Sequence, residues 1–491
     1  MKGIKILSLI LAALTLALAS CGESGGGGVS APSNGDAAQN GAAETEPAET
    51  APETLPSSLP EMDLGGFTLT LYRSGNSFQE KGVWSEELTG DIVEDDIYNR
   101  NKYVEETCGC KIELLETESQ HASFDMAKYV AAGDDTVDVV LDGGQFISQN
   151  AASFLNLNGL KYFDFAQPWW NQDFNNGITI GGKLFFTIGC YQISALQGVR
   201  HIIFNKTVAE NYGINAQGYY DLVHGGKWVI DVMIEDAQKV KSDLNGDGVY
   251  NSDDLWGVVG ENYDAWTLAL GCGFRCAEKD ADDMPVITFG SERNNSVMDK
   301  VMQIAGNQET TIFAQRMKGV SDVWGTVSAM KKRNNCWLFT IGGLGNAQRD
   351  MTDDYGVLPT PKFDEKQERY YHDASLGNSP TTGVPVSASD PDTVSYILEA
   401  ICWSSYYQVL PDFYDNYLNT KLARDEESVE MLQLVHSTLY YDLGALYNWG
   451  DMRMIIENMS NKPENTLQTN FAKAEKKINK DMEKTLATFE G

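Results

Sequence analysis

The segment 243–254 carries oxygen-bearing side chains at the spacing of a calcium-binding loop. Loops of this kind supply ligands from positions 1, 3, 5, 7 and 12, and need glycine at position 6 for a sharp turn. Gly248 stands at that sixth position. We expect the ligands of a Ca²⁺ ion to be Asp243, Asn245, Asp247, the backbone carbonyl of Val249, and Asp254.

Two features of this loop indicate a structural ion rather than a calcium switch. Position 12 carries Asp254 where calcium sensors carry the longer Glu, and the loop occurs once in the chain. The alternative is a solvated acidic turn, because Asn-Gly and Asp-Gly pairs form turns without a metal.

The first twenty residues predict export. Lys2 and Lys5 precede an apolar run over 7–19, which is too short to cross a bilayer as a permanent helix. Cys21 follows small residues and resembles the acylated cysteine of a bacterial lipobox. We expect residues 1–20 to be a signal peptide and Cys21 to carry a lipid.

Residues 21–60 predict a tether. No aromatic residue, Lys or Arg occurs between Gly22 and Pro60. Such a segment cannot bury enough surface to offset the entropy cost of ordering it. We expect a disordered, lipidated tether that holds a folded body at the extracellular face of the cell membrane, or in the periplasm if the cell has an outer membrane.

The net charge and the spacing of the cysteines limit which ligands and metals we expect the protein to bind. A formal net charge of −33 argues against binding nucleic acid, whose phosphates would be repelled, and against long-range attraction of an anionic ligand. Seven cysteines follow Cys21, and no two CxxC pairs with zinc-like spacing occur among them. We expect them to be small buried residues rather than metal ligands.

Strand and helix patterns alternate at the start of the body. Strands are expected at 67–71, 111–115 and 136–141, with helices at 92–107 and 124–132 between them. This order predicts an α/β fold with a parallel sheet and helices on its faces. With 491 residues, the chain is long enough for two or three domain cores.

The same patterns predict further elements along the chain. A hairpin is expected to turn at Gly181-Gly182. Further strands are expected at 199–205, 336–341 and 355–358. Further helices are expected at 206–212, 394–410, 427–441 and 469–489. Another is expected from Ile230 to Val240, with Ile230, Met233, Ala237 and Val240 on one face.

Several landmarks together resemble a known family. They occur in this order: Asp95-Asp-Ile-Tyr-Asn-Arg-Asn101, Pro168-Trp-Trp-Asn171, Ile180-Gly-Gly-Lys-Leu-Phe185, Phe204-Asn-Lys206, Gly226-Lys-Trp228, the calcium loop, and Tyr355-Gly-Val-Leu-Pro-Thr-Pro-Lys362. The body from about Glu61 onward resembles extracellular solute-binding proteins of family 1, the carbohydrate-type lipoproteins that serve ABC importers. Val229 departs from the Thr that the family often has there.

The resemblance implies a periplasmic-binding-protein-like II fold, with two α/β lobes, a hinge and one ligand in the interlobe cleft. We expect lobe 1 over 61–195, with about 350–400 returning to it. We expect lobe 2 over 196–349, with a helical C-terminal part at about 401–491. The protein would act as a monomer that delivers a sugar or oligosaccharide to ABC importer permease subunits, without catalysis.

A sugar site needs aromatic plates for the apolar faces of the ring and polar side chains for its hydroxyls. In open α/β sheets, ligands lie beyond the carboxyl ends of the strands, which favours the segments 72–84 and 142–145. Our candidate ligand-binding residues are Trp84, Asp142, Tyr191, Asn262, Trp266 and Trp403. The alternative for each of these side chains is a position in the hydrophobic core, or on a surface that binds no ligand.

Two other classes of function stay open at this stage. A glycan-active secreted enzyme needs only two carboxylates about 5 to 9.5 Å apart, although the body from about Glu61 onward carries no GxSxG or HExxH motif. An attachment or sensor protein is the other alternative, because the loop 243–254 resembles half of a dockerin. A dockerin needs a second such segment, which this sequence lacks.

Overall fold

The computed structural model describes residues 55–56, 59–75, 82–333, 335–343, 351–375, 377, 379–419 and 423–490. The expected signal peptide, the lipidated Cys21 and most of the tether lie outside the described residues. The segment from Leu55 to Gly491 forms one compact unit.

The first sheet has four strands in the order β12-β3-β1-β2. β1 (Phe67–Ser74) pairs in parallel with β2 (Cys110–Thr117) and with β3 (Val139–Gly143), and β12 (Pro380–Gly383) runs antiparallel to β3. The expected parallel sheet is therefore confirmed, with one antiparallel strand added from late in the chain.

Local sequence explains the crossover between β1 and β2. Helix α2 (Ile92–Cys108) begins where the Asp91 carboxylate accepts two free backbone amides of the first turn. It ends at Gly109, whose φ of 64° is left-handed and whose Cα lies against Asp63. The remaining helical elements around this sheet are η1 (Ala122–Asp125), α3 (Met126–Ala132), α4 (Gly144–Ile147), η2 (Ser148–Ser153), η3 (Leu157–Gly159), α5 (Gln172–Ile178), α14 (Pro391–Ser404), the π-helical turn η5 (Ser405–Val409) and α15 (Leu410–Asn419).

The second sheet has five strands in the order β10-β4-β9-β5-β8. β4 (His201–Asn205) runs antiparallel to β9 (Trp337–Gly342) and β10 (Tyr355–Leu358), whereas β5 (Trp256–Gly260) is parallel to β9 and to β8 (Thr311–Phe313). The helices around it are α7 (Lys206–Asn211), α8 (Gly218–His224), α9 (Ile230–Lys239), α10 (Tyr263–Gly271), α11 (Glu292–Ala305), η4 (Ala314–Arg316), α12 (Val323–Lys331) and α16 (Glu426–His436).

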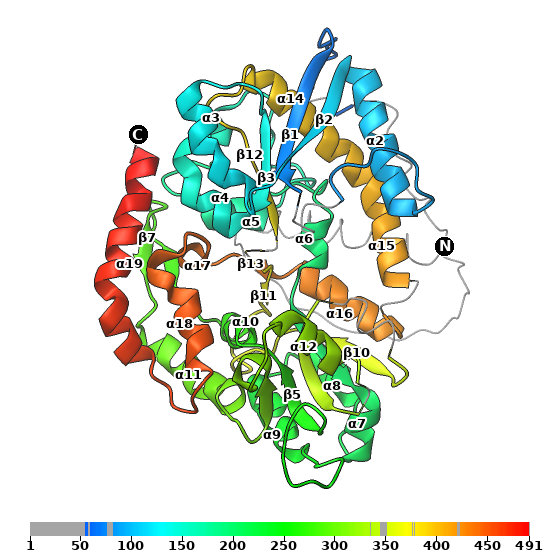
Figure 1. The fold of residues 1–491 in the computed structure, drawn as a ribbon, viewed down its shortest axis with the longest axis vertical. Helices are drawn as coiled ribbons and strands as arrows, with labels where there is room; N and C mark the ends of the chain where they lie inside the picture. The colour runs from blue at the N-terminus through cyan, green and yellow to red at the C-terminus, as the bar shows by residue number, and fades with distance from the viewer. Residues whose placement is uncertain are drawn as a thin grey trace, which may run out of the picture. The chain divides into compact units, whose positions relative to one another are not determined.

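Short segments join the two sheets, each of which forms a lobe with its own helices (Figure 1). The chain leaves the first lobe through α6 (Ser194–Gln197), and β11 (His372–Asp373) pairs in parallel with β13 (Leu439–Tyr440) as a crossing ribbon. The hairpin of β6 (Ala277–Lys279) and β7 (Pro285–Ile287) extends from the second lobe. After β13 the chain forms α17 (Leu443–Leu446), η6 (Trp449–Asp451), α18 (Met452–Met459) and α19 (Leu467–Glu490).

Several expected elements are confirmed. Residues 355–358 form a strand as predicted, and the chain turns at Gly181-Gly182, where both glycines have positive φ. The predicted apolar face of α9, Ile230, Met233, Ala237 and Val240, is fully buried. The seven described cysteines are free thiols, and all but the half-buried Cys190 are buried.

The pairing of some late elements differs from the expected lobe boundaries. β10 pairs with β4 in the second sheet, although we expected the region 350–400 to return to the first lobe. The return comes at β12 and α14, and α15 also packs on α2 of the first lobe rather than joining the second. No helix in the described part of the chain is long and apolar enough to span a membrane.

Candidate ligand-binding site

Three rings gather beyond the carboxyl ends of β2 and β3. His121 stacks on Phe146 with ring centroids 3.4 Å apart, and Phe124 stands edge-on to both at 5.2 and 6.2 Å. Phe124 is 45% exposed. We call His121, Phe124 and Phe146 the aromatic group. It offers a stacking surface at the edge of the sheet where this class of fold binds ligands.

Asp142 holds the aromatic group in place through hydrogen bonds to Ser123 and His121. Its Oδ2 accepts hydrogen bonds from the backbone amide and hydroxyl of Ser123 at 3.0 and 2.6 Å, and its Oδ1 lies 3.2 Å from Nδ1 of His121. Asp142 is only 2% exposed, so in this conformation its carboxylate orients the His121 ring.

The second lobe contributes a buried ion pair at the carboxyl end of β5. Nη2 of Arg200 donates to Glu261 at 2.9 Å and to Asp264 at 2.6 Å, and its guanidinium lies 4.5 Å over the Tyr263 ring. Asp264 also accepts the Glu261 amide at the start of α10, and a Cβ on Gly260 would overlap this carboxylate. The sequence therefore needs glycine at the end of β5 for this close approach.

Electrostatics keeps Arg200 charged in this buried position. Burial works against the charged guanidinium, but Asp264 and Glu261 outweigh it and raise the pKa of Arg200. Burial lowers the pKa of the nearby Lys331 amine to about 8. A buried charge of this kind persists only with partners in contact.

Arg453 on α18 links the two lobes. Its Nη2 donates to Gln145 of the first lobe at 2.9 Å, its Nη1 pairs with Glu457, and its guanidinium lies 5.0 Å from the Tyr263 ring. Asp373 on the crossing ribbon interacts electrostatically with Tyr263. Burial raises the pKa of Asp373 and of Glu457.

We call Arg200, Glu261, Tyr263, Asp264, Asp373 and Arg453 the polar cluster. The buried atoms in and beside it that have no hydrogen-bond partner within the described part of the chain include Nε of Arg200, Nε of Arg453, the hydroxyl of Tyr263, both carboxylate oxygens of Asp373, and Oδ1 of Asn262. Most buried polar atoms in proteins are paired, so unpaired ones gathered in one place suit the hydroxyls of a ligand or ordered water.

Comparisons with known proteins agree with this architecture. No protein-family model and no curated protein matches the chain. An ABC substrate-binding protein from Listeria monocytogenes, in complex with cycloalternan, gives a TM-score of 0.53 at 13% identity, over 85% of this chain and 99% of that one. A cyclo/maltodextrin-binding protein complexed with maltotetraose gives a TM-score of 0.55 at 13% identity, over 84% and 97%. The chain has the periplasmic-binding-protein-like fold. The apo form of RafE from Streptococcus pneumoniae also matches, with a TM-score of 0.52 at 14% identity, over 85% and 98%.

Two of the predicted ligand residues lie beside the candidate site. Asp142 supports the aromatic group, and Asn262 precedes Tyr263 of the polar cluster. Tyr191, Trp266 and Trp403 are buried in hydrophobic clusters with exposed fractions of 0%, 0% and 2%, and Trp84 is partly buried against one of them. Their contact with a ligand stays a prediction.

Several candidate residues were not predicted from the sequence. Phe146 directly follows the favoured segment 142–145, and Arg453 carries no local sequence signal. Trp324, in the first turn of the helix α12 that follows the end of β8, is 60% exposed. A large exposed aromatic ring at this end of a sheet is a further candidate plate.

The calcium loop connects α9 with β5. The backbones of Ser242 and Leu255 pair across its base, and Gly248 has the positive φ expected of position 6. The Asp243 carboxylate accepts the Gly248 amide at 2.8 Å, and the fully buried Asp254 accepts two backbone amides of the loop.

The donor set of this loop mixes carboxylates with an amide and a carbonyl. The Asp247 carboxylate accepts the Val249 amide and the side chain of Asn245, and the carbonyl of Val249 accepts the side chain of Asn251. Among the described residues, no three His, Cys, Asp or Glu side chains form a group that could hold a metal. The Asn245 side-chain oxygen accepts the Asp247 amide at 2.9 Å, so an ion would have to draw this oxygen and the Val249 carbonyl away from hydrogen bonds within the loop.

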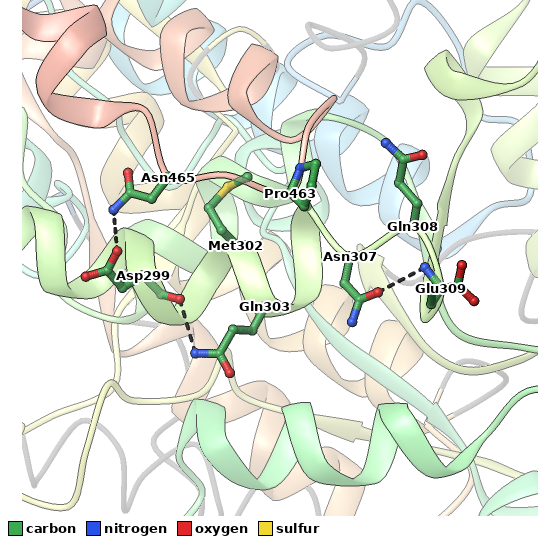
Figure 2. A pocket seen from close by; sticks show the side chains of 9 residues that line it. Asp299, Met302, Gln303, Asn307, Gln308, Glu309, Pro463 and Asn465 are labelled. Atoms are coloured by element: carbon green, nitrogen blue, oxygen red, sulfur yellow. Dashed lines mark hydrogen bonds between the residues drawn. The ribbon is translucent and has the colours of Figure 1, made fainter.

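Two pockets lie outside the candidate site. The larger, of about 590 Å³, lies between the C-terminal half of α11 and the segment before α19 (Figure 2). It is lined by Asp299, Met302, Gln303, Gly306, Asn307, Gln308, Glu309, Pro463 and Asn465. Figure 2 shows Asn465 donating to the Asp299 carboxylate at 2.7 Å, Gln303 donating to the backbone carbonyl of Asp299, and Asn307 accepting the backbone amide of Glu309. A smaller pocket of about 320 Å³ lies beside the crossing ribbon, lined by Asp173, Gly177, Arg369, Tyr371, Leu439, Tyr440 and Tyr441.

Proposed function

We propose that this protein binds a neutral sugar or oligosaccharide between the aromatic group and the polar cluster, and delivers it to the permease subunits of an ABC importer. The observation that carries the proposal is the reach of Arg453 in the polar cluster, which contacts Tyr263 of one lobe and, in the other, Gln145, the residue before Phe146 of the aromatic group. Sugars need a ring to stack on and polar groups for their hydroxyls, and the site offers both.

The charge balance favours an uncharged ligand. Two arginines of the polar cluster face the carboxylates of Glu261, Asp264 and Asp373, and the chain carries a net charge of −33. An anionic ligand would displace these pairs and meet a repulsive field. The matching fold is also that of proteins solved with cycloalternan and with maltotetraose.

Titration calorimetry with linear and cyclic oligosaccharides tests the proposal. We expect one of them to bind, and Phe146→Ala to weaken that binding by about tenfold, the loss of a stacked ring being worth ~1 kcal/mol or more. The control is Tyr250→Ala, which removes an exposed ring from the calcium loop and should leave the affinity unchanged. Equal loss in both variants would contradict the assigned site.

We propose that the protein binds its sugar without cleaving or otherwise altering it. Incubating the protein with the oligosaccharide that binds most tightly, followed by chromatography, should return that sugar intact. Appearance of shorter products would favour the glycan-active enzyme instead.

We also propose that the protein is lipidated at Cys21 and held, as a monomer, at the extracellular face of the membrane. The motif around Cys21 supports this proposal. In the native host, Cys21→Ala should release the protein into the medium or the periplasmic fraction, and mass spectrometry of the wild type should find an acylated N-terminal cysteine. Retention of the variant in the membrane would contradict it.

We propose further that the loop 243–254 binds a structural Ca²⁺ ion through Asp243, Asn245, Asp247, the carbonyl of Val249, and Asp254. The spacing of these oxygens supports it, as does the positive φ of Gly248. Ca²⁺ at millimolar concentration should raise the melting temperature relative to chelator, because an ion that binds only the folded state stabilises it. Asp247→Ala should abolish that rise, and a rise unchanged in the variant would place the ion elsewhere.

A further inference from the structure

The backbone just before α18 is strained. Asn448, Gly450 and Asp451 have φ of 53°, 59° and 58°, a left-handed conformation that residues other than glycine rarely adopt. Strained residues persist only when the surrounding structure holds them, and they gather at functional sites. We call 448–451 the strained turn.

The C-terminal helix α19 holds the strained turn from outside. The indole of Trp449 donates to Thr485 at 2.8 Å, and the backbone amide of Gly450 donates to the Asp481 carboxylate at 2.9 Å. A Cβ on Gly450 would overlap Ile478 of the helix, so the turn and α19 are in direct backbone contact.

The strained turn leads directly into Arg453. Only Met452, which is fully buried, separates the two, and Arg453 lies in the first turn of α18. Its guanidinium reaches Gln145 in the first lobe and Tyr263 in the second. The direction of the Arg453 side chain therefore depends on the backbone that α19 holds.

α19 also contacts both lobes (Figure 1). Near its start, Phe471 packs on Phe289 of the second lobe with ring centroids 6.0 Å apart. Near its end, Phe489 packs on Phe185 with ring centroids 4.7 Å apart. Phe185 belongs to the first lobe, because Thr187, two residues further on, forms a β-bridge with Thr382 of β12. The helix thus has an anchor on each lobe and the strained turn between them.

We propose that α19 is a strap that positions Arg453 for ligand binding, with Asp481 and Thr485 as positioning residues that act through the strained turn. The inference rests on the proposed function, because Arg453 belongs to the proposed sugar site. It assigns to a helix outside that site a direct effect on affinity.

Affinity measurements on variants of α19 test the strap. Asp481→Ala removes the acceptor for the Gly450 amide, and Thr485→Val removes the acceptor for the Trp449 indole with little change of shape. Asp481→Ala should weaken oligosaccharide binding by about tenfold, because it removes a hydrogen bond to a charged group, and Thr485→Val should weaken it by about threefold to fivefold, because it removes a neutral hydrogen bond. The control is Glu483→Ala, an exposed residue of the same helix, which should leave the affinity unchanged.

A double-mutant cycle separates positioning from general destabilisation. If α19 acts through Arg453, then Asp481→Ala should cause no further loss of affinity once Arg453→Met is present. If the fold-loss of affinity in the double variant equals the product of the two single losses, Asp481 acts independently of Arg453 and the strap proposal is wrong.

Hydrogen exchange of the ligand-free protein tests the strap independently of the proposed sugar binding. If wild type binds no sugar, the proposed function fails, and the strap is then judged by exchange alone. Asp481→Ala should speed exchange at the amides of 450–454 and also at those of 144–147 around Gln145. Faster exchange confined to 477–485 would overturn the strap, whether or not a sugar binds.

Discussion

Arg200 carries its charge inside the protein because two carboxylates accompany it. The side chains of Arg200 and Glu261 are each 6% exposed, and that of Asp264 is fully buried. Removing one partner from a buried ion pair leaves an uncompensated charge, which costs far more than losing an exposed pair. Residues of the candidate site therefore also serve the stability of the second lobe.

Arg200→Met should lower the free energy of unfolding by about 3–5 kcal/mol, since Asp264 and Glu261 would then be buried without a cation. The comparison is Lys102→Met, which breaks a half-exposed pair with Glu105 and should cost about 0–1 kcal/mol. Urea unfolding of both variants measures the difference. Similar costs would mean that the Arg200 pairs are solvated in solution.

The buried His201 and His372 and the partly buried His436 bind protons more weakly in the folded chain than in the unfolded chain. Burial lowers the pKa of His201 to about 3 and that of His436 to about 4, and it lowers the pKa of His372 well below its usual range. An unfolded chain binds a proton at each of them below about pH 6.5. Each folded pKa is depressed, so each histidine takes away stability as the pH falls from about 6.5 towards its folded value.

His201→Gln should therefore become relatively more stable in acid. For each unit that the pH falls between about 6 and 4, the free energy of unfolding of the variant minus that of wild type should rise by about 1.4 kcal/mol. Urea midpoints across that range measure the shift. Ile203→Val removes no titratable group from the same buried strand, so its difference from wild type should stay constant with pH.

Residue type alone does not separate an aromatic plate from an aromatic core residue. Trp266 and Tyr191 were favoured by their positions, yet both are fully buried, whereas Phe124 lies half exposed beside Phe146. Which ring remains at the surface depends on how distant segments pack. The sequence could predict that the ends of the strands matter, as Asp142 illustrates, but not which neighbouring ring would face solvent.

Among the elements, the β6–β7 hairpin makes a specific contact with the first lobe. At its turn, Asp283 has a φ of 62°, and its carboxylate accepts the Gly182 amide at 2.9 Å and pairs with Lys279 at 2.6 Å. Its carbonyl accepts the Gly181 amide. One tight turn of the second lobe thus binds the backbone of another tight turn in the first.

Asp283→Ala should lower the free energy of unfolding by about 1–2 kcal/mol, because it removes the acceptor for Gly182 and places a residue poorly suited to positive φ at the turn. Asp283→Asn should cost less, since Asn tolerates this conformation and keeps an acceptor oxygen. Thermal unfolding measures both. The exposed neighbour Asp282→Ala is the control, and a loss there as large as in Asp283→Ala would contradict the specific contact.

Local pattern predicts an element better than it predicts the partner of that element. Residues 355–358 were expected as a strand and form β10, but pairing with β4 joins them to the second sheet. Apolar alternation is a property of a few neighbouring residues, whereas strand pairing depends on segments about 150 residues apart. For the same reason the helix face of α9 was predictable and the packing of α15 on α2 was not.

At the scale of the whole molecule, the two lobes divide the candidate site between them. The aromatic group follows strands of the first sheet, and most of the polar cluster belongs to the second lobe and to α18. Short segments and the crossing ribbon join the lobes, an arrangement that permits hinge closure around a ligand. The family resemblance predicted this division, whereas composition alone could only bound the number of domains.

A ligand held by both lobes should change the shape of the protein as well as its stability. Saturating oligosaccharide should decrease the radius of gyration measured by small-angle X-ray scattering, and at 100 times Kd it should stabilise the fold by about 2.7 kcal/mol. Phe146→Ala in the first lobe and Tyr263→Ala in the second should each weaken binding of the same sugar. If only one lobe holds the ligand, only that lobe's variant will lose affinity, and the radius of gyration will stay constant because nothing draws the other lobe in.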